Sequence, residues 1–428
     1  MRKKVALIFL LVLVTVSCRS NVGRFINRKI PGGKNSFYTD DIIAVMVNDT
    51  NKIRVGLLLP LSGAVKGVGE VLLNTAQLSI FNNNKKNIVL KVYDTNGTTF
   101  GAVKAANKAI ADGIDVMVGP LFSAETKAIK NIVKKNDLLL FSLSNDQSLA
   151  NISNVFVTGS IPEQEIQLLI SYLIDNDIHN YVSFLPNNEH GAEINKILRT
   201  AVTGKDGLLI KSDYYDDNDL NIMTKLSDLT NYYEIPQTIY DEYQKKKTEQ
   251  KLLGYSEDVP FVIKDEEKIY PQCVFIADGG KRAEELARLM FIIQNSGNNL
   301  QFVGTSKFDG DNSILSNPYM NGVIFVGGNP KKLDKFYRDY SEIYRQDPIK
   351  IASMLYDLIN IIDYTYKKTK NGRYLPDKKT LLDPFGFDGI DGRFRFLPNG
   401  IVERNMFVLQ ILDKKKVVLY NAEEFLNY

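Results

Sequence analysis

The residues of this sequence that could hold a small molecule gather in short polar loops, each placed directly after an apolar run. These loops are 60–63, 119–123, 142–145, 186–191, 278–280 and 305–306. They offer serine hydroxyls, backbone N–H groups, one imidazole (His190) and carboxylates that include Asp278. Hydroxyl and N–H groups donate to a carboxylate, and a carboxylate accepts from an ammonium. The loops therefore predict noncovalent capture of a small polar solute.

Residues suited to metal chemistry are scarce. The 428 residues include two histidines, His179 and His190, and two cysteines, Cys18 and Cys273. That supply is too small for an imidazole-rich metal site, a four-thiolate zinc site or a disulfide framework. Cys273 lies in an apolar run and is expected to be a small buried hydrophobic residue rather than a nucleophile.

Motifs of enzymes and cofactor sites are incomplete or missing. The run Gly67-Val-Gly69 lacks the third glycine of a dinucleotide-binding loop, because position 72 is leucine. The run Asp309-Gly-Asp311 starts like a calcium loop, but it has no glycine at the sixth position and Met320 at the twelfth. The sequence contains no P-loop and no Gly-x-Ser-x-Gly elbow. We expect no enzyme activity, no cofactor and no metal.

Apolar runs of strand length alternate with amphipathic stretches of helix length along most of the chain. Expected strands are 52–60, 88–93, 114–118, 137–141, 155–158, 181–185, 207–212, 273–277, 301–304 and 322–326, and expected helices are 68–82, 100–112, 124–135, 162–176, 191–203, 220–232, 281–295, 331–345 and 350–368. Strands that are apolar throughout indicate parallel sheets covered by helices on both faces. The fold class is therefore α/β, with two Rossmann-like lobes, and a ligand would lie between the carboxyl ends of the two sheets.

Two later segments depart from this alternation. Residues 233–268 contain a charged run of mixed sign, 242–251, which indicates a solvated helix or surface insertion rather than a binding patch. Near the C-terminus, 391–396 alternates in polarity, and 407–412 with 417–420 predicts a hairpin.

The N-terminus predicts export. Three bases, Arg2, Lys3 and Lys4, precede an apolar stretch from Val5 to Ser17, which is shorter than the ~20 residues of a spanning helix. The following Thr15-Val-Ser-Cys18 resembles a lipoprotein processing box, with threonine where an aliphatic residue is commoner. We expect residues 1–17 to be a signal peptide, Cys18 to be lipidated, and residues 18–51 to form a tether. The alternative is an ordinary signal peptide with an incidental cysteine.

Charge gives no clue to a partner. The whole chain has 53 Lys and Arg against 50 Asp and Glu, a net charge of +3. Removal of residues 1–17 takes away three bases and no acid, so the mature chain is formally neutral. A neutral chain does not favour nucleic acid as a partner.

Two runs of the body resemble a known family. The run Ile53-Arg-Val-Gly-Leu-Leu-Leu-Pro-Leu-Ser-Gly63, followed by an amphipathic helix, is similar to the opening of type I periplasmic ligand-binding proteins of the leucine/isoleucine/valine-binding kind. The run Asp115-Val-Met-Val-Gly-Pro-Leu-Phe-Ser123 resembles the third-strand motif of that family. The likeness spans about 52–412, and the Ala-Asp-Gly-Gly run at 277–280 with Thr305-Ser306 is most similar to the penicillin-binding-protein activator lipoproteins.

The resemblance implies two lobes joined by hinge strands. Lobe one would hold 52–155 and 328–385, and lobe two would hold 156–327 and 386–428. It also implies a set of ligand-binding residues, with His190 in place of a tyrosine usual in the family: Ser62, Gly63, Leu121, Phe122, Ser123, Ser142, Ser144, His190, Asp278 and Thr305. Hydroxyls of lobe one would bind a ligand carboxylate, and Asp278 would meet its ammonium. A plainer interpretation makes Ser123 a helix N-cap and Asp278-Gly279 a turn.

Two functions follow from the resemblance. The first is an envelope-anchored periplasmic binding protein that closes around a small solute such as an amino acid and serves a membrane permease. The alternative is an activator lipoprotein that binds a peptidoglycan synthase. Both place the protein in the periplasm on a lipid anchor at Cys18, and Arg19, which follows that cysteine, favours the outer membrane.

Overall fold

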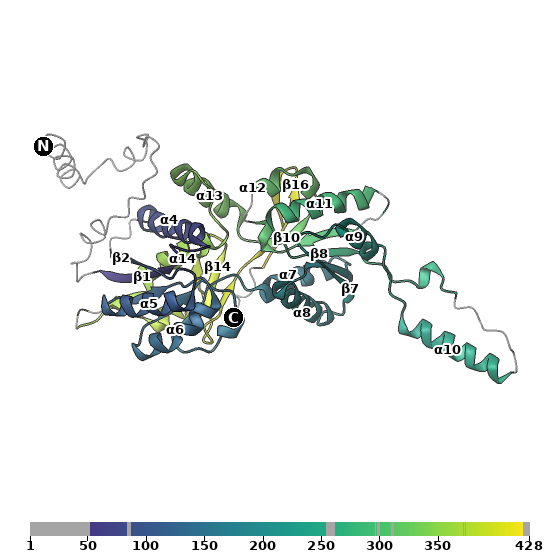
Figure 1. The fold of residues 1–428 in the computed structure, drawn as a ribbon, viewed down its shortest axis with the longest axis horizontal. Helices are drawn as coiled ribbons and strands as arrows, with labels where there is room; N and C mark the ends of the chain where they lie inside the picture. Colours follow the sequence, from purple (N-terminus) through teal and green to yellow (C-terminus); the bar gives the residue numbers. More distant parts are fainter. Residues whose placement is uncertain are drawn as a thin grey trace.

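The computed structural model describes residues 52–422 apart from 84–86, 254–261, 296, 298–299, 310–311, 371 and 373. The expected signal peptide, Cys18 and the tether lie outside the described residues. Two sheet-and-helix bodies lie side by side, and the chain passes between them three times (Figure 1). No helix of the described residues is long and apolar enough to cross a membrane.

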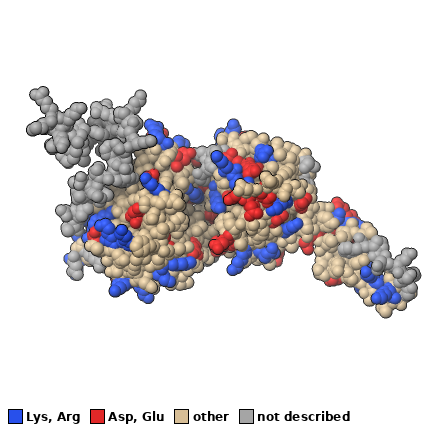
Figure 2. Space-filling view, viewed as in Figure 1, with Lys and Arg blue, Asp and Glu red and all other residues tan. Residues whose placement is uncertain are grey.

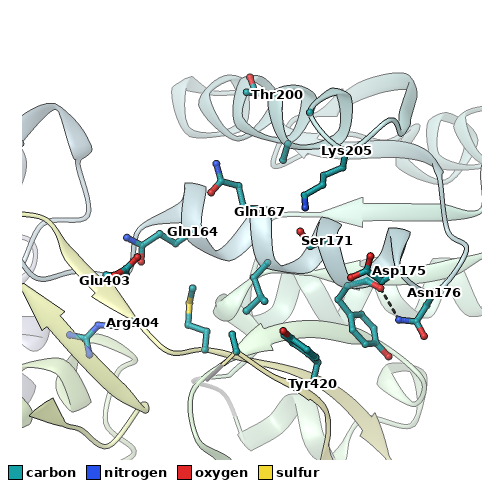
Figure 3. Close-up of a pocket in the computed structure, with 16 residues that line it drawn as sticks. Gln164, Gln167, Ser171, Asp175, Asn176, Thr200, Lys205, Glu403, Arg404 and Tyr420 are labelled. Carbon is teal, nitrogen blue, oxygen red and sulfur yellow. Dashed lines mark hydrogen bonds between the residues drawn. The ribbon is translucent and has the colours of Figure 1, made fainter. Parts of the chain in front are cut away.

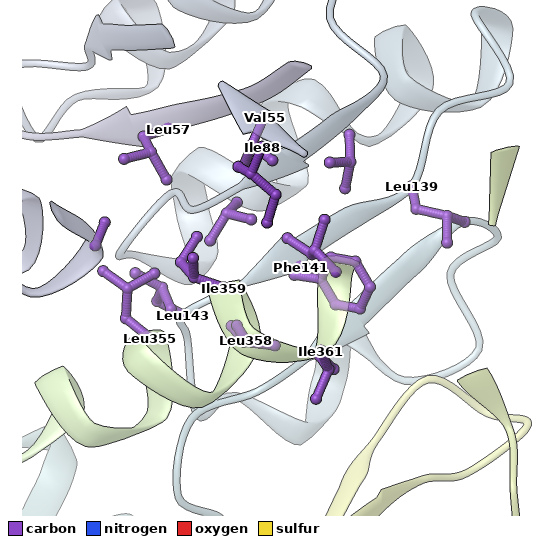
Figure 4. Close-up of a cluster of buried hydrophobic side chains, with 14 of the residues drawn as sticks. Val55, Leu57, Ile88, Leu139, Phe141, Leu143, Leu355, Leu358, Ile359 and Ile361 are labelled. Carbon is purple, nitrogen blue, oxygen red and sulfur yellow. The ribbon is translucent and has the colours of Figure 1, made fainter. Parts of the chain in front are cut away.

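The first body, hereafter lobe one, is built on a parallel sheet of five strands in the order β2-β1-β3-β4-β5. Its strands are β1 (Ile53–Leu59), β2 (Ile88–Asp94), β3 (Val116–Val118), β4 (Leu140–Ser142) and β5 (Val155–Val157). Helices α4 (Lys66–Asn82) and α14 (Ile351–Thr365) pack on one face, and α5 (Thr99–Ala111) and α6 (Ser123–Lys135) pack on the other. Figure 4 shows Leu57 and Phe141 of the sheet against Leu355 and Leu358 of α14. Burial on both faces explains why most residues of these strands are apolar.

The second body, lobe two, has a sheet of seven strands in the order β17-β16-β10-β9-β8-β6-β7. Its strands are β6 (Asn180–Pro186), β7 (Leu208–Tyr215), β8 (Cys273–Ile276), β9 (Gln301–Gly304), β10 (Ile324–Gly327), β16 (Phe407–Leu412) and β17 (Lys415–Asn421). Helices α7 (Pro162–Ile174) and α8 (Glu189–Thr203) cover one face, and α9 (Ile222–Thr230) and α11 (Gly280–Asn295) cover the other. The five strands β6 to β10 are parallel, and β16 and β17 form the predicted antiparallel hairpin. The α/β fold class with parallel-strand sheets is confirmed.

The late β segment divides between the lobes differently from the prediction. Strands β13 (Phe387–Asp388), β14 (Arg393–Phe396) and β15 (Val402–Arg404) form a small antiparallel sheet. We expected 386–428 in lobe two, but Phe394, Phe396 and Val402 lie in the core of lobe one. The Phe396 ring centroid is 5.6 Å from that of Phe141 and 5.1 Å from that of Phe156. Only β16 and β17 extend the second sheet, so the third crossing follows β15.

Further helices and strands complete lobe one and fill the connections. Helix α13 (Pro330–Tyr344) packs on α4, beside α14. The remaining elements are η1 (Gln147–Leu149), η2 (Asp265–Glu267), η3 (Ser306–Phe308), α12 (Asn312–Ser316), η4 (Pro318–Met320), β11 (Tyr366–Lys368), β12 (Tyr374–Pro376) and α15 (Lys378–Leu381).

The insertion within 233–268 forms an arm that extends away from lobe two (Figure 1). Its helix α10 (Gln237–Leu252) has no buried residue. Backbone hydrogen bonds of 2.9 Å in both directions between Glu234 and Ile269 close the base of the arm. The predicted solvated helix is confirmed.

Candidate functional site

The loop after β1 is held in place by the residues that follow β2. Asp94 Oδ1 accepts hydrogen bonds from the backbone N–H groups of Leu61 (2.9 Å) and Ser62 (3.2 Å). Ser62 Oγ lies 3.2 Å from Asn96 Oδ1. Burial alone would raise the pKa of Asp94, but the hydrogen bonds that it accepts outweigh burial and lower that pKa. Sequence reasoning found Ser62 and Gly63 but missed Asp94 and Asn96, which position them.

The loop after β3 requires a glycine and presents Phe122 and Ser123. Gly119 has φ +94°, and a Cβ there would lie 2.1 Å from the carbonyl oxygen of Leu58. Phe122 is 39% exposed, and Leu121 packs against the core of lobe one. Helix α6 starts at Ser123, and the Phe122 N–H, at the N-cap, donates to Glu125 Oε2 at 3.1 Å. Among the described residues, the Ser123 hydroxyl has no hydrogen-bond partner, so it is not the helix cap.

The two serines after β4 face inward. Ser142 is fully buried, and its Oγ lies 2.7 Å from Thr126 Oγ1. Ser144 is 5% exposed, and its Oγ accepts the N–H of Asp146 at 3.1 Å. Both hydroxyls fix the shape of the 142–145 loop, in the conformation described, and neither is open to solvent.

A buried carboxylate lies beneath these loops. Glu125, 1% exposed, is in the first turn of α6. Burial raises its pKa, against hydrogen bonds from Thr95 and from the Phe122 N–H. A glutamate three residues after a helix N-cap is a recognised sequence signal for capping, and it could have pointed to this residue.

Lobe two brings His190 next to a lysine that sequence reasoning missed. Asn188 caps α8 by accepting the Gly191 N–H at 3.0 Å, which places His190 in the first turn. Lys307 Nζ lies 2.9 Å from His190 Nε2 and donates to the carbonyl oxygen of Ala277 at 3.1 Å. Burial lowers the pKa of His190, and Lys307 lowers it further, against the effect of Asp278. Lys307 comes two residues after the predicted Thr305, so its place after β9 was the available signal.

Asp278 lies in the same group but is bonded to its own lobe. Its Oδ2 accepts from the Tyr215 hydroxyl at 2.8 Å, and its Oδ1 accepts from the Gly279 N–H at 2.8 Å. Burial raises the pKa of Tyr215, and the neighbouring Asp278 raises it further. The carboxylate therefore closes the turn and also holds Tyr215.

Thr305 begins the turn η3, which is tied to α7. Glu165 of α7 accepts hydrogen bonds from the Ser306 N–H (3.2 Å) and hydroxyl (2.7 Å). Thr305 is 7% exposed. The predicted site residues thus form two groups, one on each lobe, at the carboxyl ends of the strands. Among the described residues, no hydrogen bond or ion pair joins one group to the other.

A cavity of about 830 Å³ opens at a different place, between α7, α8 and the strands β15 to β17 (Figure 3). Gln164, Gln167 and Ser171 of α7 face it, with Tyr420 of β17 opposite. No predicted site residue lines this cavity. Acidic and basic side chains are interspersed over the face of both lobes that Figure 2 shows.

The described residues contain no group of three or more His, Cys, Asp or Glu side chains that could hold a metal ion. Cys273 is fully buried, and burial raises its pKa, as expected for a hydrophobic residue of the core.

Comparisons with known proteins agree with this architecture. Residues 52–226 match the family model described as periplasmic binding protein. The Leu/Ile/Val-binding protein BraC3 of Rhizobium johnstonii is 29% identical over 149 residues, which are 33% of this chain and 40% of the relative. The penicillin-binding protein activator LpoA of Histophilus somni is 22% identical over 369 residues, which are 83% of this chain and 53% of the relative. The chain thus spans about half the length, or less, of the curated relatives that it matches.

A solved structure gives the same answer for the fold. The branched chain amino acid ABC transporter periplasmic ligand-binding protein of Burkholderia xenovorans superposes with a TM-score of 0.62 at 14% identity, over 88% of this chain and 97% of the other. These similar proteins are described as binding proteins or as an activator.

Proposed function

Because residues 52–226 match the periplasmic binding protein model and the described chain has the type I fold of the Leu/Ile/Val-binding proteins, we propose that this protein is an envelope-anchored solute receptor. It closes its two lobes around a small solute such as an amino acid. It then delivers the solute to a membrane permease, or signals through a membrane partner.

The observation that carries the proposal is the position of the polar loops. In open parallel sheets, ligands bind outside the carboxyl ends of the strands, where helix N-termini and loop N–H groups converge. Lobe one offers there the Ser62 loop and the unpartnered hydroxyl of Ser123, and lobe two offers His190, Asp278 and Lys307. Hinge closure between two such lobes is a common way to enclose a solute.

In this proposal the residues divide by role. Ser62, Gly63 and Ser123 bind the carboxylate of the solute, with Leu121 and Phe122 beside it. His190, Asp278 and Thr305 line the opposite wall. Ser142 and Ser144, being buried, support the loop that carries them. Cys18 holds the lipid anchor, with the outer membrane as the favoured location.

One observation favours the alternative function, an activator that binds a penicillin-binding protein. The likeness to the activator LpoA covers 83% of this chain, whereas the likeness to BraC3 covers 33%. In that case the lobes present a protein-binding surface, and solute binding is reduced or lost.

Thermal unfolding in the presence of solutes separates the two functions. A solute at 100 times its Kd adds about 2.7 kcal/mol of stability, so a true ligand raises the Tm measurably. We expect at least one small solute to raise the Tm, and Ser123→Ala to reduce the rise. If no amino acid or small acid raises the Tm, and the lipidated protein recovers a peptidoglycan synthase from solubilised envelope, the receptor proposal is wrong and the activator function replaces it.

A further inference from the structure

An ammonium group is held at the carboxyl edge of the sheet of lobe two by three separate loops. Lys307, in η3, donates to the carbonyl oxygen of Ala277 just after β8 (3.1 Å) and lies 2.9 Å from Nε2 of His190 in α8. The turn that carries Lys307 is itself fixed, because Glu165 accepts from the backbone and the side chain of Ser306. The position of the ammonium is therefore set by contacts with three loops of the fold.

This group keeps donor capacity for a ligand. An ammonium has three N–H donors and no acceptor, and the described residues supply acceptors for two of them, Ala277 O and His190 Nε2. Since Nε2 must accept, a neutral imidazole carries its proton on Nδ1, which becomes a second donor. The Lys307 residue as a whole is exposed. Neighbouring atoms nevertheless exclude water from its ammonium group, and this desolvation lowers its pKa.

The two nearby carboxylates are engaged with other groups. Both oxygens of Asp278 accept from neighbours in lobe two, Tyr215 and Gly279. Glu165 accepts from Ser306. Among the described residues, neither acid forms an ion pair with Lys307, although the charges of Asp278 and Glu165 both act to raise its pKa. An ammonium with an open donor and no direct ion-pair partner is free to donate to an anion.

We propose that Lys307, positioned by His190, is a ligand-binding residue that takes a carboxylate of the solute, and that the solute is therefore an acidic one. This inference rests on the proposed function, because it assumes that a solute is held between the loops of the two lobes. It narrows the expected ligand from a small solute such as an amino acid to a solute with a carboxylate directed at lobe two.

The experiment uses pairs of probes that differ only in a carboxylate: L-glutamate with L-glutamine, and benzoate with benzamide. L-leucine serves as the aliphatic probe. Affinities come from calorimetric titration of the full chain, and Tm shifts provide a second readout. We expect at least one acid to bind about tenfold or more tighter than its amide, since a charge-assisted hydrogen bond to the ammonium is lost with the amide.

Lys307→Met is the test variant, and Lys196→Met, which removes an exposed lysine of α8 in the same lobe, is its matched control. We expect Lys307→Met to weaken binding of the acid about tenfold or more and to change binding of the amide by less than threefold. Lys196→Met should leave both unchanged. The unliganded Tm of each variant shows whether it is folded.

The outcomes distinguish the inference from the function on which it rests. If L-leucine or an amide binds as tightly as the acids, or if Lys307→Met leaves the ratio of acid to amide unchanged, the solute receptor stands and the assignment of Lys307 is wrong. If none of the five probes binds, the assignment of Lys307 to these acids is wrong, and the wider Tm screen with the synthase recovery decides whether the receptor function stands. If a carboxylate is bound only as part of an acidic protein surface, that result also overturns the proposal of a free acidic solute.

Discussion

Substitution of Lys350 should disrupt the junction between the lobes. Its Nζ lies 2.9 Å from Asp309 Oδ2 of lobe two and 2.8 Å from Asp391 Oδ1 in the loop between β13 and β14. The Asp309 and Asp391 side chains are 0% and 5% exposed. The crossing segment runs between them, because Gly328 donates its N–H to Asp309 Oδ2 at 2.7 Å and Asn329 donates its N–H to the Asp391 carbonyl oxygen at 2.6 Å. One lysine thus pairs with a carboxylate on each side of the segment that crosses between the lobes.

The expected magnitude follows from what Lys350→Met leaves behind. Removal of one partner of a buried ion pair costs about 3–5 kcal/mol, because the other charge stays buried and uncompensated. Here Asp309 retains Lys416 at 2.7 Å and Asp391 retains the Ser353 hydroxyl at 2.6 Å, so the lower end of that range applies. We expect the free energy of unfolding to fall by about 3 kcal/mol.

The pH dependence gives a second, independent measure. Burial alone would raise the pKa of Asp309, but Lys350 and Lys416 outweigh burial and hold it at about 2, below its ordinary 3.8. A carboxyl with a depressed pKa stabilises the fold above its unfolded pKa, and that stability is lost as the pH falls toward the folded pKa. A difference of nearly two pKa units corresponds to roughly 2 kcal/mol, lost between about pH 4 and pH 2. In Lys350→Met this loss should shrink, because the pKa of Asp309 rises.

Urea denaturation between pH 2 and pH 7 measures both effects. The matched control is Lys335→Met, which breaks an exposed pair with Asp339, with side chains 70% and 35% exposed, and should change stability by less than about 1 kcal/mol. If Lys350→Met is no less stable than Lys335→Met, these ion pairs do not stabilise the junction between the lobes. The same follows if Lys350→Met loses as much stability between pH 4 and pH 2 as the parent does.

Four further predictions concern the proposed site and the fold. Ser123→Ala should weaken solute binding by about 1.5–3 kcal/mol if its hydroxyl meets a carboxylate, with unchanged stability of the free protein; calorimetric titration checks both, and equal affinity would misplace the site. Gly119→Ala should lower stability by about 2 kcal/mol or more, since its φ is +94° and the new Cβ would meet Leu58 O at 2.1 Å. Gly67→Ala, with nothing within 4 Å in helix α4, should raise stability by up to about 1 kcal/mol, and urea denaturation compares the two. Replacement of 235–268 by a short turn should change the Tm by less than about 2 °C, because helix α10 buries nothing; a larger fall would show that the arm supports lobe two.

The strands and helices could be predicted because each has a local signature. Strands of lobe one such as β1 and β4 are covered on both faces, so nearly all of their residues are apolar, with Arg54 and Ser142 as the polar exceptions. The lobe against which an antiparallel segment packs has no such signature in the local sequence. The alternation of 391–396 predicts a strand, but only the packing of Phe394 and Phe396 on lobe one shows where it belongs.

The site was partly predictable for a similar reason. The strand ends at 60–63 and 119–123 are visible as turn residues after apolar runs, so Ser62 and Ser123 could be found. Whether a hydroxyl faces solvent depends on neighbours from other elements: Ser142 is engaged by Thr126 of α6, whereas Ser123 has no such partner among the described residues. Lys307 could not be predicted as a site residue, because its contacts depend on the packing of β8, α8 and η3.

The turn that carries Lys307 also reaches the junction between the lobes. Asp309 follows η3 directly. Phe308, which separates Lys307 from Asp309, is fully buried in the core of lobe two. A solute that binds Lys307 therefore acts on a rigid turn whose other end holds Lys350 of lobe one through Asp309. Since a ligand shifts a conformational equilibrium only by its differential affinity for the two states, a change at either end of this turn should alter both closure and affinity. Lys350→Met should accordingly change the Kd of any solute whose affinity Lys307→Met also changes. This effect would be indirect, because Lys350 pairs with Asp309 and Asp391 and not with the solute.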